Sequence, residues 1–262
     1  MKDIIIREQK ILSIIDEVME YLRITQNKID LIIEKKGEID LVTEADKGSE
    51  KRLIDFILKN FPHDSILGEE GSNIIGTSDY KWIIDPLDGT TNYAHKIPLF
   101  SISIGIENLV SKEIEFGLIA LPFFNDVYIA RNKNGSFKNK TQLKISSSSS
   151  LIESLTCTGF PYNRRDEIER LLKNLKIFLL NTRGIRRTGS AALDLAWVAD
   201  GKFDIFYETN LNPWDMSAGS IIIKEAGGVV SKMDGSEFDV YFPEILASNP
   251  TLHKEIISNF KL

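Results

Sequence analysis

Two carboxylates lie three positions apart in the octapeptide Asp-Pro-Leu-Asp-Gly-Thr-Thr-Asn, which occupies residues 85–92. The preceding residues 80–84 are mostly apolar or aromatic and predict a buried strand. Carboxylates at the end of a buried strand cost free energy unless a positive charge lies between them. A hard divalent cation such as Mg²⁺, which prefers oxygen ligands, would supply that charge. Asp85 and Asp88 are therefore candidate ligands of a divalent cation.

The residues that follow the two carboxylates could supply a further cation ligand and a binding site for a phosphate. Pro86 fixes one φ angle and leaves the carbonyl of Leu87 free to point inward as a further oxygen ligand. Gly89 and Thr90 can open a short helix whose first backbone N–H groups would face an anion. The same residues also fit an ordinary turn built on Asp-Pro and Asp-Gly, and the octapeptide alone leaves this alternative open.

Two further acidic residues lie at the end of a predicted strand or the start of a predicted helix, where α/β sheets place their active sites. Glu69 follows a short strand at 65–67, and Asp215 opens a helix after Pro213. Taken alone, Glu69 fits a solvated turn and Asp215 fits helix capping. Together with the octapeptide they predict an all-oxygen cluster, which selects Mg²⁺, Mn²⁺ or Ca²⁺. The three histidines lack the spacing of zinc ligands.

Composition and charge disfavour several broad classes of protein. The chain has 262 residues, of which 42% are hydrophobic and 27% are charged, as is usual for a soluble globular protein. The net charge of −6 disfavours a general nucleic-acid or anionic-membrane binder, and no apolar run is long enough to span a bilayer. A single cysteine, Cys157, rules out an intrachain disulfide and fits a reducing compartment, so we expect a cytoplasmic protein.

Hydrophobic periodicity places these residues on a chain with two halves. In the first half we expect a helix over about 5–24, a charged loop or lid at 34–40, a helix capped by Thr43 and ending near 60, and strands at 65–67, 80–84, 100–108, 113–121 and 126–130. After a hinge of five serines at 146–150, we expect strands at 154–158, 183–187, 203–207 and 228–232, alternating with helices at 166–180, 190–200 and 214–226. The first set predicts a largely antiparallel sheet and the second a parallel or mixed sheet.

In chain order, the motifs resemble those of the inositol monophosphatase family, which belongs to the metal-dependent, lithium-sensitive phosphatases. The matching segments are Val-Thr-Glu-Ala-Asp at 42–46, Gly-Glu-Glu at 68–70, the stretch 82–92, Gly-Ser-Ala-Ala at 189–192, Pro-Trp-Asp-Met-Ser-Ala-Gly at 213–219 and Glu-Ala-Gly-Gly at 225–228. They span nearly the whole chain. We expect a layered αβαβα sandwich that forms one catalytic domain over 1–262, with halves of about 1–145 and about 151–262.

The resemblance implies a set of metal ligands. One metal would be held by Glu69, Asp85 and the Leu87 carbonyl, and a second by Asp85, Asp88 and Asp215. A third, weaker ion would lie near Glu69. The expected ions are two or three Mg²⁺, with Mn²⁺ as an alternative and with Ca²⁺ and Li⁺ as inhibitors.

The resemblance also implies roles in handling water, phosphate and substrate. Asp46 and Thr90 match the pair that orients the attacking water, and Glu69 is a further catalytic residue. The N–H groups of Gly89 and Thr90 match the phosphate cradle. The substrate hydroxyls would contact Asp88, Gly189, Ser190, Ala191 and Glu208. Lys35 or Lys36 falls in the segment that acts as a lid.

The implied reaction is Mg²⁺-dependent hydrolysis of a small phosphate monoester, by metal-activated water and in-line attack, with inositol-1-phosphate as the first candidate substrate. Fructose-1,6-bisphosphate, alone or together with inositol phosphate, is the main alternative, and a nucleotide 3′-phosphate and histidinol phosphate also stay open. A basic pocket for a second phosphate would discriminate between these substrates. Its candidates are Arg164, Arg165, Arg186 and Arg187, which surface or interface charge would also explain.

The expected partners are a small phosphorylated polyol or sugar and a second copy of the chain in a homodimer, with no requirement for nucleic acid or membrane. The alternative function, from a different functional class, is that of a regulatory or binding protein that uses the same fold but does not turn over a substrate. Mg²⁺-dependent phosphate release from sugar phosphates would separate the two.

Overall fold

The structure is a computed structural model that describes residues 2–28, 33–35, 41–161 and 164–262. Its α-helices are α1 (Lys2–Leu12), α2 (Ile15–Gln26), α3 (Glu44–Asn60), α4 (Thr90–Ala94), α5 (Arg164–Asn181), α6 (Ala191–Ala199), α7 (Pro213–Glu225) and α8 (Pro250–Asn259). The strands of the first half are β1 (Ile33–Lys35), β2 (Leu41–Thr43), β3 (Ser65–Gly68), β4 (Asn73–Ile74), β5 (Tyr80–Asp88), β6 (Ser101–Asn108), β7 (Glu113–Leu121), β8 (Asp126–Arg131), β9 (Ser136–Lys138) and β10 (Thr141–Gln142). Those of the second half are β11 (Leu155–Thr158), β12 (Gly184–Arg186), β13 (Ile205–Thr209), β14 (Val229–Ser231) and β15 (Glu244–Ser248).

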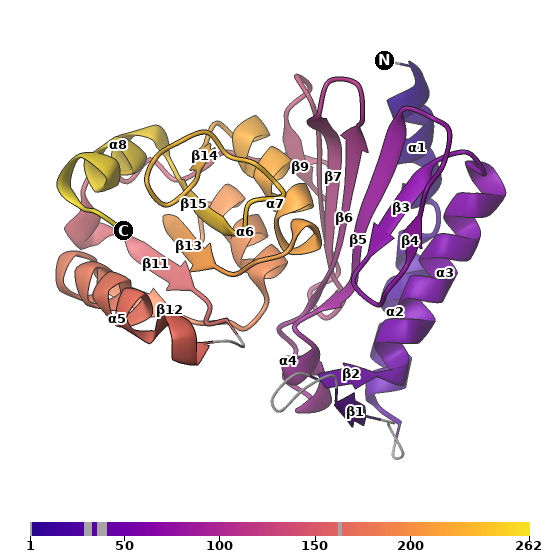
Figure 1. Cartoon of the computed structure of the whole chain (residues 1–262), viewed down its shortest axis with the longest axis horizontal. Helices are drawn as coiled ribbons and strands as arrows, with labels where there is room; N and C mark the ends of the chain where they lie inside the picture. Colours follow the sequence, from indigo (N-terminus) through magenta and orange to yellow (C-terminus); the bar gives the residue numbers. More distant parts are fainter. Residues whose placement is uncertain (1, 29–32, 36–40, 162–163) are drawn as a thin grey trace.

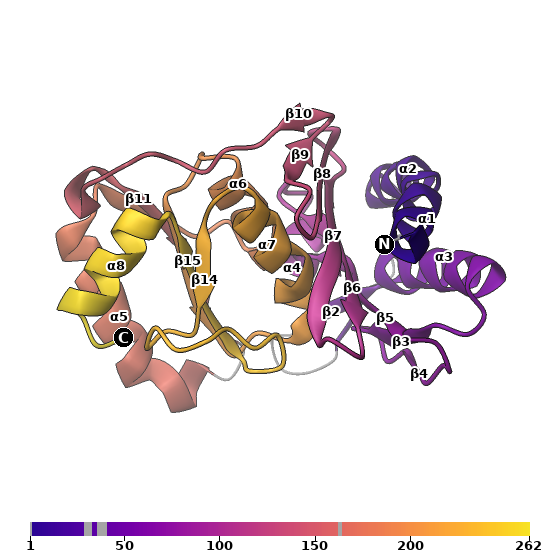
Figure 2. The ribbon, with the colours of Figure 1, turned by 90° about the horizontal axis from the view of Figure 1, so that it is seen from above.

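These elements stack as five layers (Figure 1). Helices α1–α3 cover one face of an eight-stranded sheet, and α6 and α7 lie between that sheet and a five-stranded sheet. Helices α5 and α8 cover the far face of the second sheet (Figure 2). The layers confirm the αβαβα sandwich predicted from the sequence. No helix in the described ranges is both long enough and apolar enough to cross a bilayer.

The eight-stranded sheet has the order β10-β9-β8-β7-β6-β5-β3-β4, and its strand pairs are antiparallel except for β3 with β5. The five-stranded sheet has the order β12-β11-β13-β15-β14. There β11 pairs in parallel with β12 and β13, whereas β15 runs antiparallel to both of its neighbours. The predicted antiparallel first sheet and mixed second sheet are both confirmed.

A pair of glycines lets α7 lie close to the first sheet. Gly105 on β6 and Gly117 on β7 are register partners, so the sheet has no side chains at that point. A Cβ at Gly117 would lie 2.6 Å from the Ala218 carbonyl oxygen, and one at Gly105 would lie 2.7 Å from the Ser217 Cβ. Neither distance is tolerable for real atoms, so this approach requires glycine at both positions. The close packing fixes the helix whose first turn carries Asp215.

The N-terminal helix differs from the prediction. The apolar spacing over 5–24 predicts one helix, but the chain forms α1 and α2 with a break at Ser13 and Ile14. The Ser13 hydroxyl donates to the Lys10 carbonyl at 2.6 Å, and the Ser13 N–H donates to the same carbonyl at 3.0 Å. A serine that bonds the preceding turn in this way competes with the helical hydrogen-bond pattern. The charged loop expected at 34–40 also needs correction, because Glu34 and Lys35 belong to β1.

The serine run at 146–150 connects the two sheets, and its role as a hinge stays a prediction, as does the division into two halves. The Ser146 hydroxyl donates to Asp204 at 2.6 Å. The Asn249 side chain donates to the carbonyls of Ser146 and Ser148 at 3.2 and 2.8 Å. These contacts fasten the connection to the second sheet.

Candidate metal and phosphate site

Parallel pairing of β3 with β5 brings the first two acidic positions together. The register pairs Gly68 with Ile84, so Glu69 and Asp85 are the next residues along neighbouring strands. The Glu69 N–H donates to the Ile84 carbonyl at 3.1 Å and continues this pairing. Because parallel neighbours end at the same edge of a sheet, both carboxylates leave the sheet at one place.

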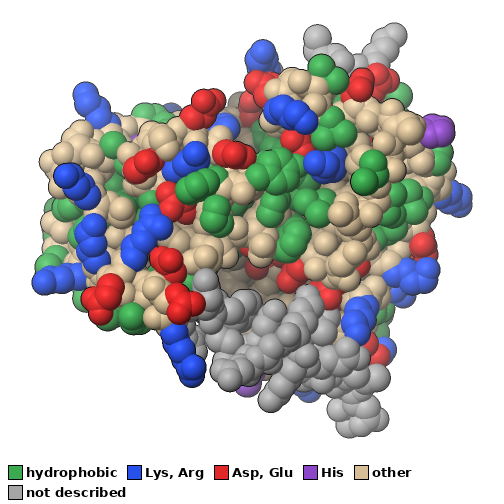
Figure 3. All heavy atoms as spheres, viewed as in Figure 1, with side chains coloured by type: hydrophobic (Ala, Val, Ile, Leu, Met, Phe, Trp, Pro, Cys, Tyr) green, Lys and Arg blue, Asp and Glu red, His purple; other side chains and the backbone are tan. Residues whose placement is uncertain are grey.

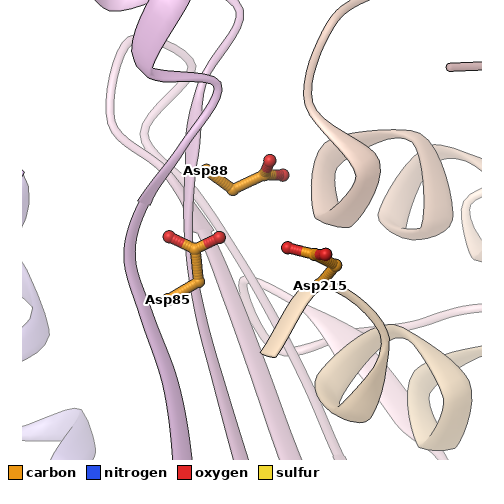
Figure 4. Close-up of side chains that lie close together, drawn as sticks. All are labelled: Asp85, Asp88 and Asp215. Atoms are coloured by element: carbon orange, nitrogen blue, oxygen red, sulfur yellow. The ribbon is translucent and has the colours of Figure 1, made fainter. Parts of the chain in front are cut away.

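A β-bulge aligns Asp88 with Asp85. Between these two residues, three steps along β5 oppose only two steps along β6. On a regular strand, residues three apart point to opposite faces of the sheet. The extra residue of the bulge returns Asp88 to the face of Asp85. Figure 4 shows both carboxylates directed toward the space beside Asp215.

Asp215 reaches this space from the other half of the chain. It lies in the first turn of α7, after Pro213, where the Asn212 N–H donates to its carboxylate at 2.7 Å. Asp85, Asp88 and Asp215 each offer a carboxylate oxygen within 4.8 Å of the others (Figure 4). The three side chains are thus close enough to share cations.

The electrostatics of this cluster fit a divalent cation. Burial, together with repulsion from neighbouring carboxylates, raises the pKa of Asp85 and Asp215 well above the usual value for aspartate. Burial also raises the pKa of Asp88, although hydrogen bonds from its neighbours oppose this. The Glu69 carboxylate adds charge and a hydrogen bond beside Asp85. A set of hard oxygen donors that repel one another is stable in its ionised form when a cation such as Mg²⁺ lies among them.

Asp46 and Thr90 form a hydrogen-bonded pair next to the Leu87 carbonyl. The backbone N–H and the hydroxyl of Thr43 donate to Asp46 Oδ2 at 2.8 and 2.5 Å, which fixes this buried carboxylate at the start of α3. Thr90 Oγ1 donates to Asp46 Oδ1 at 3.0 Å and lies 3.2 Å from the Leu87 oxygen. Burial raises the pKa of Asp46 to about 6. The pair expected to orient water is therefore assembled beside an expected metal ligand.

Gly89 precedes the short helix α4 in a conformation that favours glycine. Its φ of 94° lies in the left-handed region. A Cβ there would lie 3.1 Å from the Leu99 carbonyl oxygen and 3.3 Å from that of Gly189. Strand β5 can therefore turn directly into α4, whose first N–H groups have no partner within the helix.

Residues of the second half lie opposite the carboxylates of the first half and line the other side of the site. Ser190 caps α6, its hydroxyl donates to Asp88 at 2.5 Å, and the Ala192 N–H donates to the same oxygen at 2.8 Å. Glu208 lies on β13, where burial and nearby carboxylates raise its pKa well above the usual value. A Cβ at Gly159 would overlap the Glu208 carboxylate, so this glycine leaves room for it.

One pocket between the halves gathers most of the residues predicted from the sequence. They are Glu69, Asp85, Leu87, Asp88, Gly89, Thr90, Gly189, Ser190, Ala191, Glu208 and Asp215. Asp46 joins them through Thr90. In the face shown by Figure 3 the surface is hollowed between the halves, and acidic side chains lie at the edge of the hollow.

The lid stays a prediction. Lys35 ends β1, in a hairpin whose second strand lies against α4, but its side chain lies outside the described structure. Lys36 lies outside the described residues altogether.

Asp194 lines the pocket although the sequence did not single it out. Asp194 is buried, accepts a hydrogen bond from the Thr188 hydroxyl at 2.7 Å, and has its pKa raised by burial. Its signal in the sequence is a lone acid in the otherwise apolar segment Ala-Ala-Leu-Asp-Leu-Ala-Trp-Val-Ala.

Of the four candidate arginines, Arg187 lines the pocket, whereas Arg165 and Arg186 are exposed and do not. The side chain of Arg164 lies outside the described structure.

Comparison with known proteins gives a consistent result. The inositol monophosphatase family model matches residues 4–261. An inositol-1-monophosphatase from Synechocystis sp. is 40% identical over 231 residues, which are 87% of this chain and 79% of that protein. The Nus factor SuhB of Pseudomonas aeruginosa is 36% identical over 240 residues, 89% of this chain and 88% of that protein. The solved structure of inositol monophosphatase from Anabaena matches with a TM-score of 0.84 and 36% identity, over 96% of this chain and 95% of that one.

These similarities extend over nearly the whole chain. They confirm the predicted enzyme class, a phosphoric monoester hydrolase. The chain belongs to the inositol monophosphatase family.

Proposed function

We propose that this protein is a Mg²⁺-dependent phosphatase of small phosphorylated polyols, with inositol-1-phosphate as the first candidate substrate. The observation that carries the proposal is the convergence of Asp85, Asp88 and Asp215, whose carboxylate oxygens lie within 4.8 Å of one another. The Asp46–Thr90 pair lies at the same pocket. Carboxylates and a positioned hydroxyl suit hydrolysis without a covalent phosphoenzyme.

The proposed cation ligands are those expected from the sequence. Glu69, Asp85 and the Leu87 carbonyl would hold one ion, and Asp85, Asp88 and Asp215 a second; a third would lie near Glu69. Bound there, Mg²⁺ would lower the pKa of water toward neutrality and offset the charge of the phosphate oxygens.

The proposed role of Thr90 follows from its hydrogen bonds. Its hydroxyl proton is directed to Asp46 Oδ1, so the lone pairs of Thr90 Oγ1 are left to accept a hydrogen from water. Asp46 is itself held by Thr43, which keeps the Thr90 hydroxyl in one orientation. An attacking water aimed in this way avoids the entropy cost of finding its line of attack.

The proposed polyol contacts lie on the C-terminal wall. The Glu208 carboxylate could accept hydrogen bonds from two neighbouring hydroxyls, as a carboxylate has two oxygens. Gly189, Ser190 and Ala191 approach the pocket beside Asp88. The backbone N–H groups of Gly89 and Thr90 are the proposed phosphate cradle, which the left-handed turn at Gly89 directs into the pocket.

The test is phosphate release from a panel of inositol-1-phosphate, fructose-1,6-bisphosphate, a nucleotide 3′-phosphate and histidinol phosphate, with Mg²⁺ and with EDTA. We expect Mg²⁺-dependent turnover, highest with the inositol ester, and inhibition by Li⁺ and Ca²⁺. The same assay with Mn²⁺ tests that alternative ion. Asp88→Asn should abolish turnover while the fold is retained, and near-normal turnover by this variant would rule out the metal assignment.

A binding role without turnover is the second candidate, because several relatives are named Nus factor SuhB. The binding role would be favoured if the folded, Mg²⁺-loaded protein released no phosphate from any substrate of the panel. We further propose a homodimer in the cytoplasm, on the strength of the family likeness, and sedimentation of the purified protein measures the oligomeric state.

A further inference from the structure

Strand β6 begins with a strict alternation of small and large side chains. In the segment Ser-Ile-Ser-Ile-Gly-Ile at 101–106, the three isoleucines belong to the core that also contains residues of α1, α2 and α3. Ser101, Ser103 and Gly105 therefore point to the other face of the sheet, toward α6 and α7. Both serines are fully buried. A buried hydroxyl costs free energy unless it is hydrogen-bonded, so the partners of these serines indicate what they do.

Ser103 joins β6 to the first turn of α7. Its hydroxyl donates to the Trp214 carbonyl at 2.8 Å, across 111 residues of sequence. Trp214 immediately precedes Asp215 in that turn. A backbone carbonyl has two lone pairs, so the Trp214 oxygen can accept this bond in addition to one within the helix. Ser103 thus fixes the backbone beside Asp215.

The same serine lies opposite Asp85. The register of β5 and β6 pairs Asp85 with Ser103. Directly opposite residues of antiparallel strands place their side chains on one face of the sheet, with Cβ atoms about 4.5–5.5 Å apart. Ser103 is therefore next to Asp85 through the sheet and next to Asp215 through its hydrogen bond. Figure 4 shows the carboxylates of these two aspartates on opposite sides of one gap.

A second contact fastens the other end of α7. The carboxylate of Glu225, the last residue of the helix, accepts hydrogen bonds from the N–H groups of residues 133–135 at 2.8, 3.1 and 2.7 Å. Glu225 lies ten residues after Asp215, which corresponds to about 15 Å along the helix axis. Ser103 and Glu225 therefore both hold α7 on the first sheet, but Ser103 alone of these two acts at the end that carries Asp215.

We propose that Ser103 is a positioning residue that sets the separation of Asp85 and Asp215, and so determines the affinity for the cation that these two aspartates would share. This inference rests on the proposed Mg²⁺-dependent function. Ser103 does not belong to the described residues that line the pocket, so it acts through the backbone of α7. The ion proposed for Glu69, Asp85 and the Leu87 carbonyl has no ligand on α7, so it should not depend on Ser103.

The test measures binding of Mn²⁺ to the full-length protein without substrate. The paramagnetic resonance signal of free Mn²⁺ gives the number of bound ions and their dissociation constants. We expect Ser103→Ala to weaken one ion by about tenfold or more and to leave the others unchanged, as is usual when a group that orients a metal ligand is removed. Ser103→Cys keeps the shape of the side chain with a weaker donor, so it should show a smaller loss at the same ion.

Two control variants separate positioning from general stability. Glu225→Gln should lower Tm but keep every Mn²⁺ constant, because it loosens the end of α7 far from Asp215. Ser136→Ala removes a hydroxyl that is equally buried in the same sheet but has no hydrogen-bond partner among the described residues, so it should change neither quantity.

The Mg²⁺ dependence of phosphate release gives a second readout. Ser103→Ala should need about tenfold more Mg²⁺ for half-maximal release, whereas kcat at saturating Mg²⁺ should stay close to that of the wild type, because no group that contacts the substrate is lost.

Three outcomes would overturn the role of Ser103. The first is equal Mn²⁺ constants for the wild type and both Ser103 variants, the second is a loss spread evenly over all bound ions, and the third is an equal loss in Glu225→Gln. A wild type that binds the ions as expected but releases no phosphate would contradict the proposed function alone, and the Mn²⁺ constants would still decide the inference. A wild type that binds no divalent ion would overturn both.

Discussion

Ser190 donates its hydroxyl proton to Asp88 at 2.5 Å, across 102 residues of sequence. Asp88 ends a strand of the first sheet, whereas Ser190 caps α6, a helix of the second half. The Ala192 N–H binds the same oxygen of Asp88 at 2.8 Å. The orientation of one proposed cation ligand is therefore set by the helix start on the opposite wall.

Removing that hydroxyl should weaken cation binding without unfolding the protein. Ser190→Ala should raise the Mg²⁺ concentration for half-maximal activity by about tenfold, the usual cost of losing a group that orients a metal ligand. The remaining N–H of Ala192 should keep Asp88 near its place. Ser146→Ala is the control, because it removes a similar serine–aspartate bond of 2.6 Å on the second sheet. Identical Mg²⁺ curves for wild type and Ser190→Ala would contradict the role given to this bond.

The repulsion among the clustered carboxylates predicts effects of opposite sign with and without Mg²⁺. Asp85→Asn removes one buried charge, so in EDTA it should raise Tm by about 2–4 °C, which corresponds to roughly 1 kcal/mol in a chain of this size. In Mg²⁺ the wild type should gain stability by mass action, about 2.7 kcal/mol at a hundredfold excess over Kd, and the variant should gain little. Thermal melts of both proteins measure this, with the exposed Asp55→Asn as control. A variant that is less stable in EDTA would count against the cluster.

The hydrogen bond from Thr90 to Asp46 predicts a defect in turnover rather than in metal binding. Thr90→Val keeps the shape of the side chain but removes the hydroxyl, so kcat should fall about 10²–10³-fold while stabilisation by Mg²⁺ persists. Thr90→Ser restores the hydroxyl and should recover most of the rate. Steady-state kinetics with melts in Mg²⁺ separate the two effects. If Thr90→Val kept its kcat, the proposed aiming of water would be wrong.

The left-handed turn before α4 predicts a stability cost that depends on local crowding. Gly89→Ala places a Cβ at φ 94° within 3.1 Å of the Leu99 carbonyl oxygen. Gly227→Ala has a comparable φ of 90° but no atom within 4 Å of its Cβ. The strained conformation alone should cost about 1–2 kcal/mol at Gly227, and crowding should add to it at Gly89. Urea unfolding of both variants measures the difference, and equal costs would show that the close approach has no energetic effect.

His253 predicts a loss of stability in acid. It is 7% exposed, and its ring nitrogens lie 2.9 Å from the Ser231 hydroxyl and 3.2 Å from that of Ser248. Burial lowers its pKa from 6.5 to about 4, so the unfolded chain takes up the proton first. The contribution of neutral His253 to the free energy of unfolding is therefore complete above pH 6.5 and is lost as the pH falls through 4.

The variant His253→Gln isolates this contribution. Between pH 7 and pH 4 the free energy of unfolding of the wild type should fall by up to about 3 kcal/mol more than that of the variant. Urea titrations across this range measure the difference, and the exposed His63→Gln serves as control. Parallel pH curves for wild type and His253→Gln would contradict the assignment.

The layered fold and the acidic positions could be predicted because each depends on local sequence. Apolar runs such as 80–84 specify buried strands by themselves, and Thr43 signals the start of α3 through its capping box. The octapeptide at 85–92 carries its own turn chemistry. Residues with such local signals lie where the sequence predicts, although their chemical roles stay predictions.

The remaining features depend on contacts that no local pattern contains. The break at Ser13 arises from a side-chain bond to Lys10, which the apolar periodicity hides. Strand β15 lies between β13 and β14 in the second sheet, yet its five residues are too few for a clear period. Arg187 lines the pocket and Arg186 does not. This difference depends on the fold around Gly189, and the sequence hides it because adjacent arginines look alike there.

The parallel pairing of β3 with β5 constrains how this chain can change in length. Glu69 and Asp85 are neighbours only because Gly68 is in register with Ile84. Deleting one residue from β3 would displace Glu69 by about 3.3 Å and send its side chain to the opposite face. The hairpin turn at 109–112 adjoins the far end of β5, where Tyr80 pairs with Asn108. Insertions and deletions should therefore accumulate at that turn and be absent from β3.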